Sequence, residues 1–115
     1  MTADALSEDL RRLHRMLLAA EAEAHGLSRD PYKMMGAAMS DARLAWLMPM
    51  LKAIAAFDAD AEGDALVRDS MRAAWAARID ALLAVPELAS HREASEHIEA
   101  LLTSIDARLT DWRGA

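Results

Sequence analysis

The most apolar stretch of the chain, residues 40–58, constrains the fold most strongly. Its sequence, SDARLAWLMPMLKAIAAFD, places large apolar residues three or four positions apart, which is the period of one helix face. The residues of this face are Leu44, Leu47, Leu51, Ile54 and Phe57. The stretch therefore predicts a central helix. Pro49 lacks a backbone N–H and clashes with the preceding turn, so we expect a kink at this residue or a break just before it.

A second long helix is predicted ahead of this stretch, from Asp4 or Ser7 to His25. Apolar residues recur there at alternating spacings of four and three, which is typical of a helix in a bundle. These residues are Leu6, Leu10, Leu13, Leu17, Ala20 and Ala24. Gly26 follows, at the position where a residue in the left-handed conformation commonly ends a helix.

Two prolines mark the start of further helices. Asp30 and Pro31 form an N-cap and first-turn pair that predicts a short helix through Met39, and Pro86 predicts the start of a final helix. Residues spaced four apart predict another helix over residues 64–84, and they are Val67, Met71, Trp75, Ile79 and Leu83. The final helix has a longer face, formed by Leu88, His91, Ala94, Ile98, Leu101, Ile105, Leu109 and Trp112. Residues 58–64, DADAEGD, predict an acidic linker.

Composition favours an all-α fold for one domain, residues 1–115. Apolar residues make up 54% of the chain, Ala is the dominant type, and the residues that favour strands are rare. Four long helices and one short helix with tight connections predict an antiparallel four-helix bundle. Trp46, Trp75 and Trp112 fall on three different predicted helices, so we expect them to anchor one core from several sides.

The acidic balance and the lack of cysteine narrow the possible partners. A formal net charge of −6 argues against nucleic-acid binding, and the basic cluster of Arg11, Arg12 and Arg15 is interpreted as a solvated helix face. Without cysteine, disulfides, iron–sulfur clusters and thiolate chemistry are excluded. No apolar run approaches the ~20 residues that span a membrane, and the N-terminal sequence is not that of a signal peptide. We expect a cytoplasmic protein that binds neither nucleic acid nor membranes.

Two patterns in the first half of the chain resemble a group of uncharacterised small helical proteins of proteobacteria. The first, Leu-His-x-x-Leu-Leu-x-x-Glu, is matched by Leu13, His14, Leu17, Leu18 and Glu21. The second, Asp-x-x-Leu-Ala-Trp-Leu-x-Pro, is matched by Asp41, Leu44, Ala45, Trp46, Leu47 and Pro49, with Phe57 and Asp58 matching loosely beyond it. The group commonly has Arg where this chain has Met48. The resemblance implies a small helical domain and carries no activity with it.

The most suggestive polar residues lie on the first predicted helix. His14, Glu21 and His25 fall near one line beside the apolar seam, and imidazole and carboxylate groups suit zinc or iron. Only Glu21 and His25 are close enough to bind one ion directly, so other helices would have to complete a site. His91 could meet His14 or Asp41 across the bundle. The alternative is an ordinary helix-surface pair together with a buried polar network that fixes helix register. The same Glu-x-x-x-His spacing recurs twice in the final helix, which favours that alternative.

A calcium loop is a further candidate site. Acidic residues occupy positions 1, 3, 5, 7 and 12 of the calcium-loop pattern, with Gly63 at position 6. They are Asp58, Asp60, Glu62, Asp64 and Asp69. The residues at positions 5, 8 and 12 depart from the usual choice, and the chain offers no second loop to pair with this one. These departures favour an ordinary acidic loop between helices.

Methionines gather around the predicted short helix and the central proline. They are Met34, Met35, Met39, Met48 and Met50. Thioethers can bind Cu(I), but methionine also fills irregular cores and forms adaptable contact surfaces. Core filling is the simpler interpretation. If these residues are partly exposed, they predict an interface with a partner or a second copy.

No combination of residues indicates catalysis. The chain has no Gly-x-Ser-x-Gly, no His-Glu-x-x-His, no Glu-x-x-His of the di-iron type and no glycine-rich phosphate loop. The expected function is therefore that of a non-enzymatic helical bundle without a cofactor, acting through protein–protein contact and most simply as a homodimer. The alternative is a small bundle that binds a transition metal or haem through the His and Glu residues of the first helix.

Overall fold

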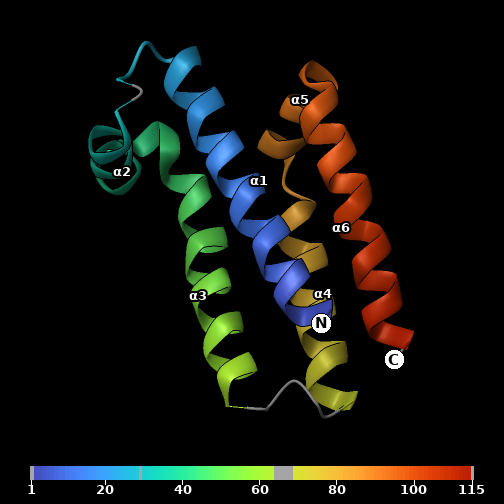
Figure 1. The fold of residues 1–115 in the computed structure, drawn as a ribbon. Helices are drawn as coiled ribbons and strands as arrows, with labels where there is room; N and C mark the ends of the chain where they lie inside the picture. Colours follow the sequence, from blue (N-terminus) through green and yellow to red (C-terminus); the bar gives the residue numbers. More distant parts are fainter. Residues whose placement is uncertain (1, 29, 64–68, 115) are drawn as a thin grey trace.

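The computed structural model describes residues 2–28, 30–63 and 69–114, and within these ranges the regular structure is entirely helical (Figure 1). The all-α prediction is confirmed. The elements are α1 (Thr2–Ala24), α2 (Pro31–Ser40), the 3₁₀ helix η1 (Ala42–Leu47), α3 (Met48–Glu62), α4 (Asp69–Leu83), α5 (Pro86–Ala94) and α6 (Glu96–Gly114). In this described part of the chain, no helix is long and apolar enough to cross a membrane.

Helix α1 buries the leucines of the predicted seam and ends where the sequence predicts. After Ala24 the chain turns at Gly26, whose φ of 65° lies in the left-handed region. The N–H of Leu27 then donates to the carbonyl of Ala22 at 2.7 Å, which satisfies an acceptor at the helix end. The left-handed conformation predicted for Gly26 is confirmed.

The predicted central helix is divided into two segments. Asp41 has an extended backbone and caps η1 by accepting a hydrogen bond from the N–H of Arg43. Helix α3 begins at Met48, so Pro49 lies in its first turn, where no intrahelical donor is needed. The change from 3₁₀ to α geometry therefore lies just before Pro49, and one continuous helix over residues 40–58 is not formed.

Helix α3 extends through most of the predicted acidic linker. Asp58 accepts hydrogen bonds from Ser7 and Arg11 of α1, and Asp60 accepts one from Nε1 of Trp75 at 2.6 Å. Because these partners hold the carboxylates against neighbouring helices, the helical backbone continues to Glu62. The linker prediction is wrong for residues 58–62.

The predicted final helix is in fact two helices, α5 and α6, separated at Ser95. This residue has an extended backbone (φ −136°, ψ 117°), and its Oγ accepts a hydrogen bond from the N–H of Ile98 at 3.3 Å. A serine that binds a nearby backbone N–H favours the start of a helix over its interior. The continuous helix predicted after Pro86 is wrong for this reason.

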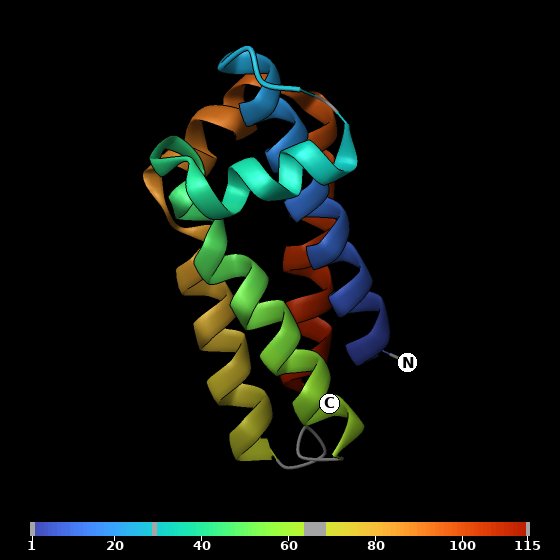
Figure 2. The ribbon, with the colours of Figure 1, turned by 90° about the vertical axis from the view of Figure 1, so that its left-hand side faces the viewer.

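The long helices α1, α3, α4 and α6 run alongside one another (Figures 1 and 2). Both α1 and α4 pack against α3 and against α6, while α5 packs against α6 and α1. Helix α2 packs on α1 and η1 and crosses the long helices near one end of the molecule (Figure 2). At this end α5 contacts both α1 and η1, through Glu21 and Trp46, which both reach His91.

An aromatic cluster joins three of the long helices in the core. Phe57 of α3 packs edge-on against Trp75 of α4 and Trp112 of α6, with ring centres 5.4 and 5.6 Å apart. Trp46 lies at the edge of the core instead, where its ring stacks on His91. Two of the three tryptophans thus join in one cluster, as expected, while the third helps to hold η1 against α5.

Candidate functional site

Glu21 bridges two histidines at one end of the molecule. Its Oε1 lies 2.6 Å from Nε2 of His91 on α5, and its Oε2 lies 3.0 Å from Nε2 of His25, one turn further along α1. Trp46 of η1 stacks on the His91 ring with 19° between the planes. The contact of Glu21 with His91 fixes the position of α5 on α1.

Asp41 and His14 do not join this cluster. Asp41 is held by Arg43, whose Nε and Nη2 donate to its two carboxylate oxygens at 3.1 and 2.8 Å. The hydrogen bonds from Arg43 are the main reason why the pKa of Asp41 is lowered to about 2, and the charge of His25 makes a smaller contribution. His91 therefore meets Glu21, and the contacts expected between His91 and His14 or Asp41 are not formed.

The cluster around Glu21 has the geometry of the polar network that the sequence offered as an alternative. Each carboxylate oxygen already has an imidazole nitrogen within hydrogen-bonding distance. Throughout residues 2–28, 30–63 and 69–114, no group of three or more His, Asp or Glu side chains is arranged to hold a metal ion. The arrangement therefore favours a structural link between helices.

The candidate calcium residues are not gathered in a loop. Asp58, Asp60 and Glu62 lie on α3, where side chains two residues apart do not face the same side. Asp64 and the side chain of Asp69 lie outside the described residues. The described half of the pattern thus lacks the loop geometry that a calcium site of this kind needs.

The predicted methionine interface divides between core and surface. Met50 is only 3% exposed and lies on the buried side of α3 with Ala53, Ile54 and Phe57, so its place in the interface prediction is wrong. Met34 is half-buried against the same core, and Met48 is half-buried at the start of α3. The spacing along α3 explains why Met50 is buried, because Met50 lies one turn before the buried Ile54 on the same helix face.

The exposed methionines share a surface with a tyrosine. Tyr32, Met35 and Met39 of α2 are 90%, 41% and 74% exposed, and their spacing of three and four residues puts them on one side of the helix. We call this surface the α2 face. Tyr32 was not part of the interface predicted from the sequence. The signal that could have found it is the helical spacing from Met35, combined with the absence of acidic residues in α2.

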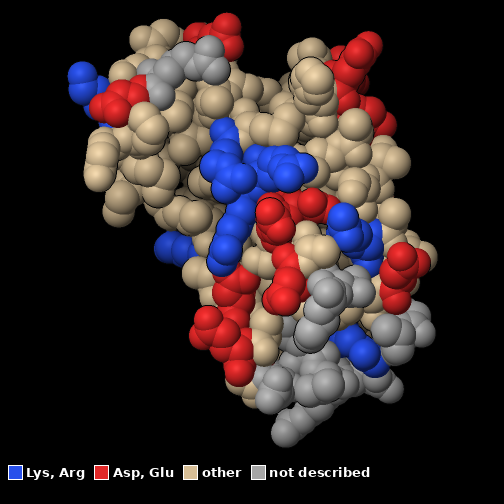
Figure 3. Space-filling view, in the orientation of Figure 1, with Lys and Arg blue, Asp and Glu red and all other residues tan. Residues whose placement is uncertain are grey.

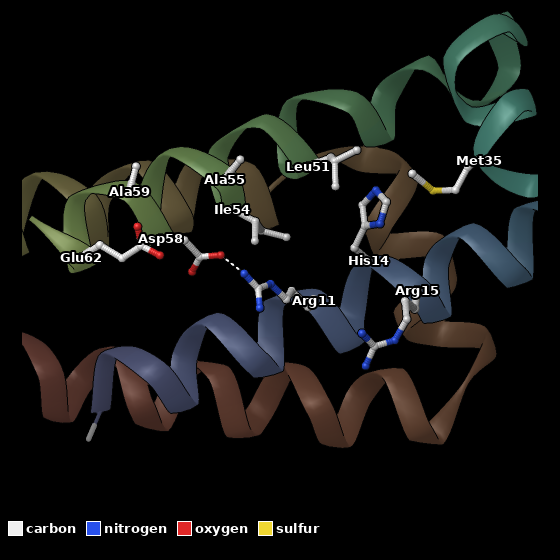
Figure 4. A pocket seen from close by; sticks show the side chains of 10 residues that line it. All are labelled: Arg11, His14, Arg15, Met35, Leu51, Ile54, Ala55, Asp58, Ala59 and Glu62. Atoms are coloured by element: carbon white, nitrogen blue, oxygen red, sulfur yellow. Dashed lines mark hydrogen bonds and ion pairs between the residues drawn. The ribbon is translucent and has the colours of Figure 1, made fainter. Parts of the chain in front are cut away.

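A groove lies between α1 and α3, and Figure 4 shows the side chains that line it. Its volume is about 560 Å³, and Met35 of α2 contributes at one end. The α1 side is formed by Arg11, His14 and Arg15, and the α3 side by Leu51, Ile54, Ala55, Asp58, Ala59 and Glu62. A second depression continues from the same arginines toward Asp4 and Glu8. The groove thus combines an apolar wall with a few charged side chains, as small-molecule sites commonly do.

Charge is distributed unevenly along this groove. Arg11 pairs with Asp58, and Asp58 and Glu62 lie together toward one end, while Arg15 and His14 lie toward the end near Met35 (Figure 4). His14 is only 5% exposed, and burial lowers the pKa of its imidazole even though a hydrogen bond with the carbonyl of Leu47 raises it. The ring is therefore uncharged near neutral pH. On the outer surface, basic side chains gather over the middle of α1 with acidic ones beside them (Figure 3).

The sequence did not predict the groove, although it did single out Arg11, Arg12 and Arg15. Ala55 and Ala59 line the α3 side of this groove with side chains too short to fill it. Two alanines one turn apart on a predicted helix were the available signal, but only the packing of α1 on α3 shows that they line a groove.

Comparison of the chain with models of protein families, with curated proteins and with solved structures finds no match.

Proposed function

We propose that the protein acts through protein–protein contact at the α2 face, most simply by forming a homodimer. The observation that carries this proposal is the exposure of Tyr32, Met35 and Met39 on one side of one short helix. A cluster of large apolar side chains in water is a typical mark of an interaction surface, whereas a single exposed one is not. Tyrosine and methionine are also enriched where proteins meet.

The packing and the sequence of α2 support the same proposal. A helix of 10 residues is marginal on its own in water, and α2 is stabilised on its inner side by contacts with α1 and η1. Its sequence, PYKMMGAAMS, has one charged residue, so its outer side has little polar surface. In this proposal the long helices form the antiparallel four-helix bundle that serves as a rigid base, and α2 is the element that a partner covers.

A size-exclusion experiment with light scattering tests the proposal. The unmodified protein is expected to be a dimer that dissociates on dilution, and Met39→Glu is expected to be a monomer at the same concentration, because a buried, unpaired carboxylate would oppose association. Ala100→Glu is the matched control, since Ala100 is exposed on α6, away from α2. A chain that is monomeric at every concentration, or a Met39→Glu variant that still dimerises, would contradict the proposal.

The alternative of a metal- or haem-binding bundle is less well supported. It would use His14, Glu21, His25, Asp41 and His91, of which Glu21, His25 and His91 lie together. Glu21 already has a histidine at each oxygen, so a metal ion would have to displace both contacts. Elemental analysis of the purified protein, with a Glu21→Gln variant for comparison, separates the two functions.

A further inference from the structure

We propose that the groove between α1 and α3 binds a small amphipathic carboxylate with the chemistry of a free medium-chain fatty acid. The carboxylate would lie at Arg15, near the end of the groove that Met35 lines, and the alkyl chain would extend from there along Leu51 and Ala55, away from Met35 (Figure 4). This binding site is separate from the dimer contact proposed above, although Met35 belongs to both surfaces.

The size and shape of the groove favour a small molecule. A volume of about 560 Å³ falls within the range of ~300–1,000 Å³ that is common for small-ligand sites. Helix α2 crosses one end of the groove, where Met35 closes it, so a partner helix could not extend through (Figures 2 and 4). A short chain with its polar head at Arg15, near the closed end, could extend toward the open end (Figure 4).

The apolar wall comes mainly from α3. Leu51 and Ile54 lie on the side of α3 that faces α1, the exposed Ala55 lies beside them on α3, and Met35 lies at the closed end (Figure 4). Burying an alkyl chain against such a surface is favourable by roughly 25 cal/mol for each Å² removed from water.

The charges fit a carboxylate at Arg15 better than anywhere else in the groove. Arg11 already holds Asp58, but Arg15 has no carboxylate within ion-pair distance among the described residues. The Arg11–Asp58 pair lies between Arg15 and Glu62, so it separates the bound anion from the acidic end (Figure 4). His14, uncharged near neutral pH, adds no second positive charge. Arginine also matches a carboxylate with two parallel hydrogen bonds.

Isothermal titration of the full chain with decanoate, below its micellar range, tests this inference. One decanoate is expected to bind per chain, and decanol is expected to bind at least about fivefold more weakly, because it lacks the charge that Arg15 recognises. Arg15→Gln should weaken decanoate binding by about fivefold. Arg12→Gln is the matched control, because Arg12 is the exposed neighbour of Arg11 on α1 but does not line the groove.

A second pair of variants tests the location. Ala55→Trp places a large ring in the groove and should reduce decanoate affinity by about tenfold or more, whereas Ala77→Trp, at an exposed position of α4, should leave it unchanged. Circular dichroism verifies folding, and if Ala55→Trp fails to fold, the arginine pair decides alone. Absence of one-to-one binding, equal binding of decanol, or equal effects of Arg15→Gln and Arg12→Gln would overturn the inference.

Failure of this inference is distinguishable from failure of the proposed function. None of the four substituted residues belongs to the α2 face, so the light-scattering result should be the same for these variants as for the unmodified chain. A dimer that binds no decanoate would overturn the groove ligand alone, and a monomer that binds decanoate would overturn the dimer alone.

Discussion

Buried polar side chains in this protein are stabilised mainly by partners on other helices. Asp9 of α1 is buried and accepts hydrogen bonds from Arg108 at 2.6 Å and from Ser104 at 3.4 Å, both on α6. Glu21 of α1 likewise has a partner on another helix, because its Oε1 lies 2.6 Å from Nε2 of His91 on α5. Each bond offsets the cost of removing a polar group from water and at the same time selects one packing of the helices.

His14 is the buried group whose protonation should be visible in stability. Burial lowers its pKa in the folded chain below the value of 6.5 for the free side chain, so the unfolded chain takes up a proton first as the pH falls. The free energy of unfolding should therefore decrease as the pH drops below about 6.5, and it should level off only below the folded pKa.

The His14→Gln variant isolates this effect. Urea unfolding at several pH values between about 5 and 8 should show a smaller decrease in stability for the variant than for the unmodified chain, because the other histidines are common to both. Identical slopes in the two proteins would show that His14 is protonated equally in the folded and unfolded states.

At the scale of single elements, two glycines should respond to alanine in opposite directions. Gly26 has a φ of 65°, where a side chain is strained even though nothing lies within 4 Å of an added Cβ. Gly36 lies inside α2, also with open space around an added Cβ. Gly26→Ala should lower the free energy of unfolding by about 1 kcal/mol, and Gly36→Ala should raise it by about 0.5–1 kcal/mol.

Thermal and urea unfolding, followed by circular dichroism, measures whether each substitution raises or lowers the free energy of unfolding. The two substitutions have the same chemistry and no steric contact, so backbone conformation is the only difference between them. A stabilising Gly26→Ala would contradict the left-handed end of α1, and a destabilising Gly36→Ala would contradict a regular α2.

Most helices could be predicted from local sequence signals, but the points where a predicted helix divides into two could not. Apolar spacing, Gly26 and the prolines locate the helices, because these signals act within one turn of the chain. At Ser95 and Asp58, the local sequence is compatible with both a helical and a non-helical backbone. Ser95 could have stayed helical, and Asp58 becomes helical because Ser7 and Arg11 hold it from another helix.

The same distinction applies to the candidate sites. The Glu21–His25 pair was predictable because its residues are one turn apart, and the structure confirms it at 3.0 Å. The bond from Glu21 to His91 joins residues 70 apart in sequence, so it depends on how α5 packs on α1. The groove likewise depends on the packing of α3 on α1, which no local pattern specifies.

At the scale of the whole molecule, the long helices and α2 have different surroundings. The aromatic cluster of Phe57, Trp75 and Trp112 and the ion pair of Asp9 with Arg108 hold the long helices together. Helix α2 lies across one end of these helices with its apolar side outward (Figure 2). A partner can therefore cover α2 without any rearrangement of the core.

Hydrogen–deuterium exchange at several protein concentrations tests this central claim most directly. If a second copy covers the α2 face, the amides of α2 that follow Pro31 should exchange more slowly as concentration rises, while those of α6 should not change. The Met39→Glu variant should lose this concentration dependence. Exchange in α2 that is the same at every concentration, or protection that develops on another helix, would contradict the proposal that the α2 face is where this protein makes contact.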